Sequence, residues 1–145
     1  MSYDHVQRSP LSLLAIALGV MFELGAWVAP SGPDVVLLIV GVIFFLVAAA
    51  FGHLRVTDRG DRLRVAYGPL PLFGREIPYA SIRGVQPGRS TFVDGWGIHW
   101  LPGRGVIWNV WGRDCIELDV EGRSRLRIGT DDPDGLYRHL AARVG

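Results

Sequence analysis

The first third of the chain is almost continuously apolar, whereas the remainder alternates between apolar and polar positions. Residues 11–52 contain only two charged side chains, Glu23 and Asp34. A Pro-Ser-Gly-Pro-Asp turn divides this stretch into apolar runs at 11–29 and 35–52. As a helix, the first run reaches roughly 28 Å, close to the thickness of the hydrocarbon core of a bilayer. The pattern therefore predicts a two-helix transmembrane hairpin.

The charges that flank this hairpin predict its orientation. Four arginines closely follow the second run: Arg55, Arg59, Arg62 and Arg64. The turn between the runs contains only Asp34. By the positive-inside rule we expect a two-pass protein of the plasma membrane with both termini cytoplasmic and residues 1–10 as a cytoplasmic N-terminal segment. A cleaved signal peptide is the alternative for the first run, but that run is longer than the usual apolar region of a signal peptide.

Glu23 is the one charged side chain inside the first apolar run. An ionisable group in a membrane helix indicates function, as a proton or ligand partner or as a polar contact between helices. Small residues such as Gly19, Gly25 and Ala26 allow helices to pack closely. One hypothesis is therefore a subunit of a membrane complex that acts through its transmembrane helices and Glu23. The alternative is that Glu23 only snorkels toward the outer surface or stays protonated.

From residue 53 onward the apolar positions recur every second residue, which predicts strands. A turn at 58–61 separates two such runs and predicts a hairpin. The chain ends in a predicted helix over 133–143, with Asp132 as its N-cap and Pro133 at its first position. The apolar face of this helix comprises Leu136, Leu140 and Val144. This face is expected to pack on the sheet or to close the end of a barrel.

The last two alternating runs permit a prediction of strand register. Placing their apolar positions on one face leaves their charged positions opposite one another on the other face. The predicted partners are Ile116 with Ile128, Glu117 with Arg127, Leu118 with Leu126, and Asp119 with Arg125, with residues 121–123 as the connection. This register gives both arginines structural partners, so we assign neither to an anion site.

Three segments stand out as a set: the run Leu63–Val65, the segment IPYASIRGV at 77–85, and RIGTDDP at 127–133, which leads into the final helix. Together with the two predicted spans they resemble bacterial membrane-anchored proteins with a pleckstrin-homology-like (PH-like) domain. The resemblance implies an α+β fold in which the hairpin precedes a cytoplasmic PH-like β-barrel or sandwich over 53–145, of about seven strands with a C-terminal helix. It implies an inner-membrane location and defines no binding residues. The inositol-lipid site of eukaryotic relatives needs a basic first hairpin, which here lacks lysine and contains two aspartates.

Four of the five tryptophans fall between residues 94 and 111, in two predicted strands joined by a Pro-Gly-Arg-Gly turn. Alternation places Trp96 and Trp100 on one face, with Trp108 nearby. Exposed aromatic side chains with an arginine at the turn favour a binding surface for a protein, a peptide or a lipid headgroup. The candidate binding residues are Trp96, His99, Trp100, Arg104, Trp108 and Trp111. The alternative is an aromatic core with a glycine-rich turn.

Residues suited to catalysis or metal binding are sparse. The single cysteine, Cys115, excludes an internal disulfide and a multi-cysteine metal site. No histidine pair has metal-ligand spacing, and the glycines near the tryptophans do not form a phosphate loop. We therefore expect a non-enzymatic, membrane-anchored interaction module with no cofactor and no metal. Its expected partners are a protein, a further copy of itself or a lipid headgroup, and not nucleic acid. A small enzyme remains an alternative, with Asp94, His99, Arg104 and Asn109 as its candidate residues.

Overall fold

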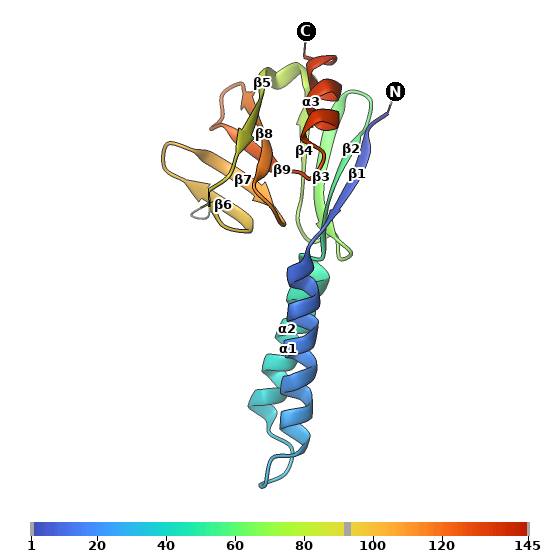
Figure 1. The fold of residues 1–145 in the computed structure, drawn as a ribbon, viewed down its shortest axis with the longest axis vertical. Coiled ribbons are helices and arrows are strands. Elements are labelled where there is room, and N and C mark those ends of the chain that lie inside the picture. Colours follow the sequence, from blue (N-terminus) through green and yellow to red (C-terminus); the bar gives the residue numbers. More distant parts are fainter. Residues whose placement is uncertain (1, 92–93, 145) are drawn as a thin grey trace.

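The computed structural model describes residues 2–91 and 94–144 and places a β-rich domain at one end of a pair of helices (Figure 1). The helices are α1 (Pro10–Trp27), α2 (Val35–Ala50) and α3 (Pro133–Ala141), with a short 3-10 turn at Tyr79–Ser81. The strands are β1 (Asp4–Arg8), β2 (His53–Asp58), β3 (Arg62–Gly68), β4 (Gly74–Pro78), β5 (Ile82–Arg89), β6 (Gly97–Leu101), β7 (Gly105–Asn109), β8 (Asp114–Val120) and β9 (Leu126–Gly129). The loop that joins α1 to α2 lies at the opposite end of the molecule from the β-rich domain.

α1 and α2 pack as the antiparallel pair that the two apolar runs predicted, and both end two residues before the predicted limits. The Asp34 carboxylate caps α2 by accepting the N–H groups of Val36 (2.9 Å) and Leu37 (3.2 Å). Small residues let the helices approach closely, since a Cβ added to Gly19 would meet the ring of Phe45 at 2.7 Å. Such packing through small residues is typical of helices in membranes.

The surface that the helix pair turns outward is apolar along its length. Side chains more than half exposed include Leu13, Leu24, Val36, Ile39 and Leu46. α1, with 18 residues and a mean hydropathy of 1.7, is long and apolar enough to cross a membrane. α2 is similarly apolar but has 16 residues. A contiguous exposed apolar surface of this kind marks contact with a membrane or another protein.

The first sheet has the strand order β1-β2-β3-β4, and all its pairs are antiparallel. β1 is an element that the sequence analysis did not anticipate in the N-terminal segment. It pairs with β2 from Asp4↔Thr57 to Arg8↔His53. The inward side chains of β1 are polar, which is why alternation did not reveal the strand. Gln7 is 4% exposed and donates to the carbonyl oxygen of Trp111 at 2.7 Å.

The second sheet has the order β5-β8-β9-β7-β6, with β7 and β9 parallel and the other pairs antiparallel. The described residues therefore form nine strands in two sheets, not the predicted seven or so, and the sheets do not close into a barrel. The barrel alternative was wrong because β1, β4, β5 and β6 each pair with one neighbour only, which leaves two edges on each sheet.

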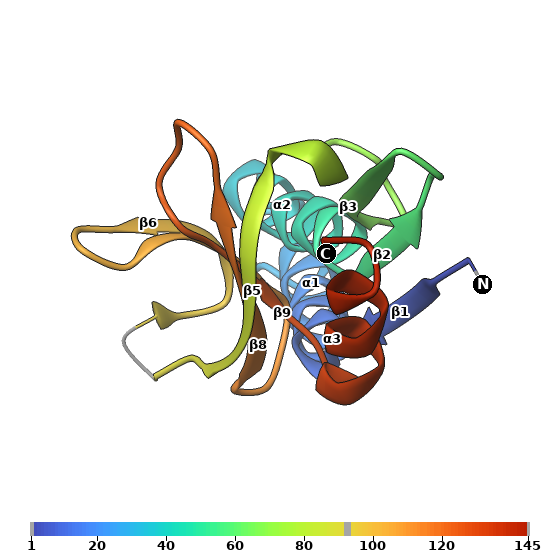
Figure 2. The ribbon, with the colours of Figure 1, turned by 90° about the horizontal axis from the view of Figure 1, so that it is seen from above.

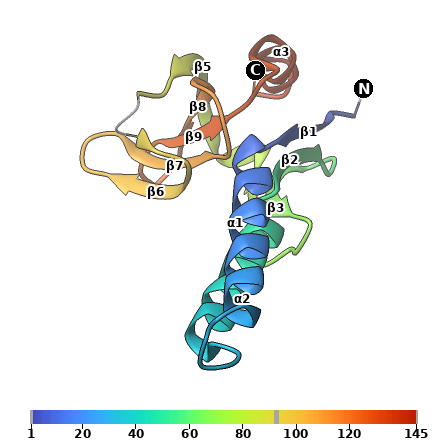
Figure 3. The ribbon, with the colours of Figure 1, turned by 60° about the horizontal axis from the view of Figure 1, so that its bottom comes forward.

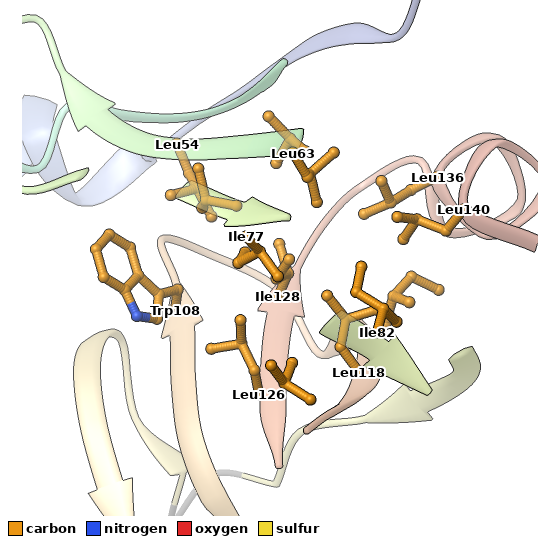
Figure 4. Close-up of a cluster of buried hydrophobic side chains, with 14 of the residues drawn as sticks. Leu54, Leu63, Ile77, Ile82, Trp108, Leu118, Leu126, Ile128, Leu136 and Leu140 are labelled. Atoms are coloured by element: carbon orange, nitrogen blue, oxygen red, sulfur yellow. The ribbon is translucent and has the colours of Figure 1, made fainter. Parts of the chain in front are cut away.

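The core lies between the two sheets and α3 (Figure 4). Leu63 and Ile77 contribute from the first sheet, Leu118 and Ile128 from the second, and all are at most 2% exposed. α3 closes one end of this core with two leucines, Leu136 and Leu140, as predicted. Its cap is also as predicted: the Asp132 carboxylate accepts the N–H of Gly135 at 3.1 Å, and Pro133 opens the helix. α3 ends at Ala141 rather than 143.

The register of the last hairpin matches the prediction at three positions. Ile116 opposes Ile128, Glu117 opposes Arg127, and Leu118 opposes Leu126. The predicted pairing of Asp119 with Arg125 is wrong. β9 begins only at Leu126, so Arg125 belongs to the connection and forms an ion pair with Glu117 at 3.2 Å, while Asp119 lies opposite Gly84 of β5.

Candidate functional site

The β6–β7 hairpin forms the outer edge of the second sheet and projects to the side of the molecule opposite β1 (Figure 2). Its register runs from Gly97↔Asn109 to Leu101↔Gly105. Gly105 has a φ of +81°, and a Cβ there would lie 1.9 Å from the carbonyl oxygen of Arg125. Only glycine fits this backbone conformation and this close approach, so the glycine-rich turn is a structural requirement of the hairpin.

The tryptophans of the segment divide into one core residue and three surface residues. Trp108 is 7% exposed and stacks on Tyr67, with ring centroids 5.5 Å apart. Trp96 and Trp111 are 41% and 39% exposed and stack on each other at 5.1 Å. Trp100 is the most exposed of the four, at 64%. Trp108 is therefore a core residue, whereas the exposure of Trp96, Trp100 and Trp111 leaves the binding hypothesis open for these three.

Arg104, expected at the tip of a binding surface, instead forms an ion pair with a buried carboxylate. Its Nη1 atom donates to Asp94 Oδ1 at 3.0 Å, and the Asp94 side chain is fully buried. Arg127 approaches the same carboxylate from β9 at 3.3 Å and reaches Glu117 at 3.0 Å through Nε. The result is a chain of charges on the face of the second sheet that points away from the core.

The balance of charge around Asp94 favours its ionised form. Burial alone would raise the pKa of this carboxyl. The backbone N–H and hydroxyl of Thr91 and the Arg104 guanidinium donate to it, and the charge of Arg127 adds to their effect. Together these interactions hold the pKa of Asp94 below its ordinary value. A buried carboxylate fixed between arginines is a structural ion pair rather than a poised general base.

The other two candidates for an enzymatic site make local contacts of their own. His99 Nε2 is 2.5 Å from the carbonyl oxygen of Trp96. Asn109 donates to the Gly112 carbonyl oxygen at 3.1 Å and accepts the Trp111 N–H at 3.2 Å, so it fixes the turn after β7. The structure thus brings Asp94 and Arg104 together but gives His99 and Asn109 separate roles.

Cys115 is fully buried on β8. Burial raises the pKa of its thiol to about 11, so the thiol is overwhelmingly protonated at neutral pH. This environment is that of an ordinary buried strand residue and does not favour a nucleophile.

An apolar cleft of about 220 Å³ lies where the hairpin meets the ends of the two long helices. Its walls include Leu11 and Ala15 of α1, Val47 of α2, and Trp96 and Val110 of the β-rich domain. The paired rings of Trp96 and Trp111 therefore lie close to the apolar helices. Indole rings at such a boundary are typical of the interface between a membrane and water.

Glu23 lies within the helix pair. A Cβ on Gly41 would meet its Oε1 atom at 2.6 Å, so the carboxyl packs on the backbone of α2 where only glycine leaves room. This placement gives Glu23 a contact inside its own hairpin. Nothing in the described residues directs it toward an interface with another chain.

A second group of titratable side chains was missed by the sequence analysis. His139 of α3 lies 3.1 Å from the Tyr79 hydroxyl and 3.6 Å from Asp58, which also pairs with Arg143 at 2.7 Å. Tyr3 stacks on the His139 ring at 5.3 Å. The one signal available was the i, i+4 spacing of His139 and Arg143 in the predicted helix over 133–143, although Arg143 lies beyond the end of α3. This cluster fastens α3 to the first sheet.

Within residues 2–91 and 94–144, no group of three or more histidine, cysteine, aspartate or glutamate side chains is arranged to hold a metal ion. Comparison with known protein families and with curated proteins finds no match for the chain.

Proposed function

We propose that the chain is a membrane-anchored, non-enzymatic binding protein. In this proposal α1 and α2 cross the plasma membrane and the β-rich domain, of PH-like type, lies at its cytoplasmic surface. There the β6–β7 hairpin binds an extended segment of a partner protein.

The observation that supports this function most directly is the exposed apolar edge formed by β6. Trp100 is 64% exposed and Ile98 is 36% exposed, and both lie on a strand that pairs with one neighbour only. An edge strand offers backbone hydrogen-bonding groups to an incoming strand, while exposed aromatic side chains supply contact area. Proteins commonly blunt such edges with charge or proline, and β6 contains neither.

The anchoring part of the proposal rests on the helix pair. α1 passes the length and hydropathy expected of a membrane span, and α2 packs beside it with an equally apolar outer surface. The arginines that follow α2 favour the cytoplasmic side for the domain. The buried position of the Asp94 carboxylate and its ion pair with Arg104 argue against a catalytic role for the same segment.

Site-specific photo-crosslinking in membranes of cells that produce the protein tests the binding surface. A photoreactive residue at position 100 is compared with one at position 137, where Tyr137 is 37% exposed on α3. The proposal predicts a discrete protein adduct from position 100 and none from position 137. Ile98→Ala should reduce the yield from position 100 severalfold, because it removes apolar contact area on the same strand.

Two results would contradict the proposal. One is an adduct with lipid alone at position 100, which would make the hairpin a membrane contact rather than a protein-binding edge. The other is a protein adduct whose yield is unchanged by Ile98→Ala and equals the yield from position 137.

A further inference from the structure

β1 and β2 adjoin the domain-side ends of the helix pair, on the side away from the β6–β7 hairpin (Figures 1 and 3). A groove of about 840 Å³ begins between α1 and α2 and continues onto the outer face of the first sheet. Its lower wall is apolar, with Leu13 and Ile16 from α1 and Phe45 from α2. Its upper wall contains Arg8 and Arg55. The groove therefore changes from apolar to basic along its length.

Strand register brings the basic side chains together. Arg8 and His53 are direct partners across β1 and β2, and Arg55 is two residues further along β2 on the same face. A second cleft adjoins the groove at His53 and Arg55 and extends the basic surface with Arg59 and Arg64. The one carboxylate lining either cleft is Asp4.

The charges of this surface are incompletely neutralised. Arg55 donates to Asp4, with Nε at 2.8 Å from Oδ1. Among the residues that the structure describes, Arg8 and Arg59 form no ion pair, and Arg64 reaches Glu76 only at 3.9 Å. Burial lowers the pKa of His53, and the positive charges of Arg55 and Arg8 lower it further. The cluster thus has unpaired positive charge that an anion can neutralise.

The distance of the basic cluster from the helix ends matches the depth of the phosphate layer of a bilayer. Arg8 and His53 lie two and three residues beyond the ends of α1 and α2. The polar layer of each leaflet is about 5–8 Å thick, and a strand advances about 3.3 Å per residue. If the helices span the hydrocarbon core, Arg8, His53 and Arg55 lie at the level of the phosphates of the adjacent leaflet. The apolar wall then lies at the level of the acyl chains.

We propose that this groove binds one anionic phospholipid of the adjacent leaflet, with its phosphate between Arg8 and Arg55 and an acyl chain against Leu13, Ile16 and Phe45. The net positive charge selects a lipid with a net negative headgroup over a zwitterionic one. This site rests on the membrane anchoring in the proposed function but not on the β6–β7 hairpin.

Electron spin resonance of the full chain in phosphatidylcholine vesicles tests the site. The probes are phosphatidylglycerol and phosphatidylcholine, each spin-labelled on the acyl chain, and the readout is the fraction of each that is immobilised by the protein. The proposal predicts that phosphatidylglycerol associates more strongly, by more than about tenfold, because two arginines contribute about fivefold each. Arg8→Gln should lower this preference about fivefold, and addition of Arg55→Gln should abolish the remainder. Arg8 has no ion pair among the described residues, so its replacement leaves the fold intact.

Two controls separate a seated lipid from diffuse attraction to the surface. Arg83→Gln in β5 with Arg138→Gln in α3 removes two charges and should leave the preference unchanged. Both elements reach the end of the domain away from α1 and α2 (Figure 1). Ala49→Leu fills the groove without changing charge and should also lower the preference, because Ala49 lines its apolar wall. Equal association of the two lipids would overturn the site. So would a preference that is unchanged in both Arg8→Gln and Ala49→Leu. Neither result would contradict the proposed function. Failure of the chain to insert into the vesicles would overturn both.

Discussion

The helix pair and the β-rich domain use apolar side chains in opposite ways. In α1 and α2 the large apolar side chains point outward, as Leu13 and Val36 do at 70% and 68% exposure, and small residues occupy the contact between the helices. In the β-rich domain the large apolar side chains are buried, and Leu118 and Ile128 are fully inaccessible. This contrast supports the proposed anchoring, in which lipid surrounds the helices and water surrounds the domain.

This contrast predicts that equal truncations have unequal effects. Leu118→Ala should lower the free energy of unfolding by about 4 kcal/mol, because it opens a cavity between the sheets. Leu13→Ala should change it by less than about 0.5 kcal/mol, because that side chain is 70% exposed. Urea denaturation of the detergent-solubilised chain, followed by tryptophan fluorescence, measures both. Similar losses for the two variants would contradict the assignment of α1 to lipid.

The buried ion pairs supply a second contrast, between two aspartates of the same domain. Asp94→Asn should cost about 3 kcal/mol, because it leaves the buried Arg127 with only Glu117 as a charged partner. Asp119→Asn, at an exposed position on β8, should cost less than about 0.5 kcal/mol. The same denaturation measurement distinguishes them. An unchanged midpoint for Asp94→Asn would show that Arg127 does not depend on this carboxylate.

Acid should destabilise the domain in two stages. Burial holds the pKa of His139 below its ordinary 6.5 despite the charge of Asp58, so the unfolded chain takes up this proton first as the pH falls. The stability that neutral His139 contributes is therefore present above pH 6.5 and is lost progressively below it. A second loss of stability begins below pH 3.8. The pKa of Asp94 is lowered in the folded chain, so the unfolded chain takes up this proton first. Melting temperature against pH should show both stages, and His139→Asn should remove only the first. A flat profile through pH 6.5 would contradict this account of His139.

The last prediction concerns the reactivity of the Cys115 thiol and involves no change in stability. Because its thiol is buried and its pKa is raised to about 11, the folded chain should react with a thiol reagent far more slowly than the urea-unfolded chain does. Alkylation followed by mass spectrometry checks this prediction. Rapid modification under native conditions would show that β8 opens readily or that the thiol is activated.

Patterns in the sequence predicted the elements that are determined by residues close together along the chain. The helix pair followed from two apolar runs and a turn, the cap of α3 from Asp132 and Pro133, and the register of the last hairpin from alternating residues. β1 was missed because its inward positions are polar, including Gln7, and because its partner β2 lies more than 40 residues away. A short strand paired over such a distance leaves no periodic signal of its own.

The candidate site shows the same limit. The sequence located the tryptophans but could not tell Trp108, which packs on Tyr67, from the exposed Trp100 on the neighbouring strand. It placed Arg104 at a tip because the partner of this arginine, Asp94, lies in a loop whose path no local pattern fixes. Arg8 and His53 came together only through the pairing of β1 with β2.

The central claim, that two helices cross the membrane and hold the domain on the cytoplasmic side, is tested most directly by cysteine accessibility. Ser31→Cys lies in the exposed turn between α1 and α2, Ala80→Cys lies on the exposed surface of the domain, and buried Cys115 contributes little background. A membrane-impermeant thiol reagent added to intact cells should label position 31 and not position 80. Position 80 should react once the membrane is permeabilised. Labelling of both positions, or of position 80 alone, in intact cells would contradict the two-pass topology with cytoplasmic termini.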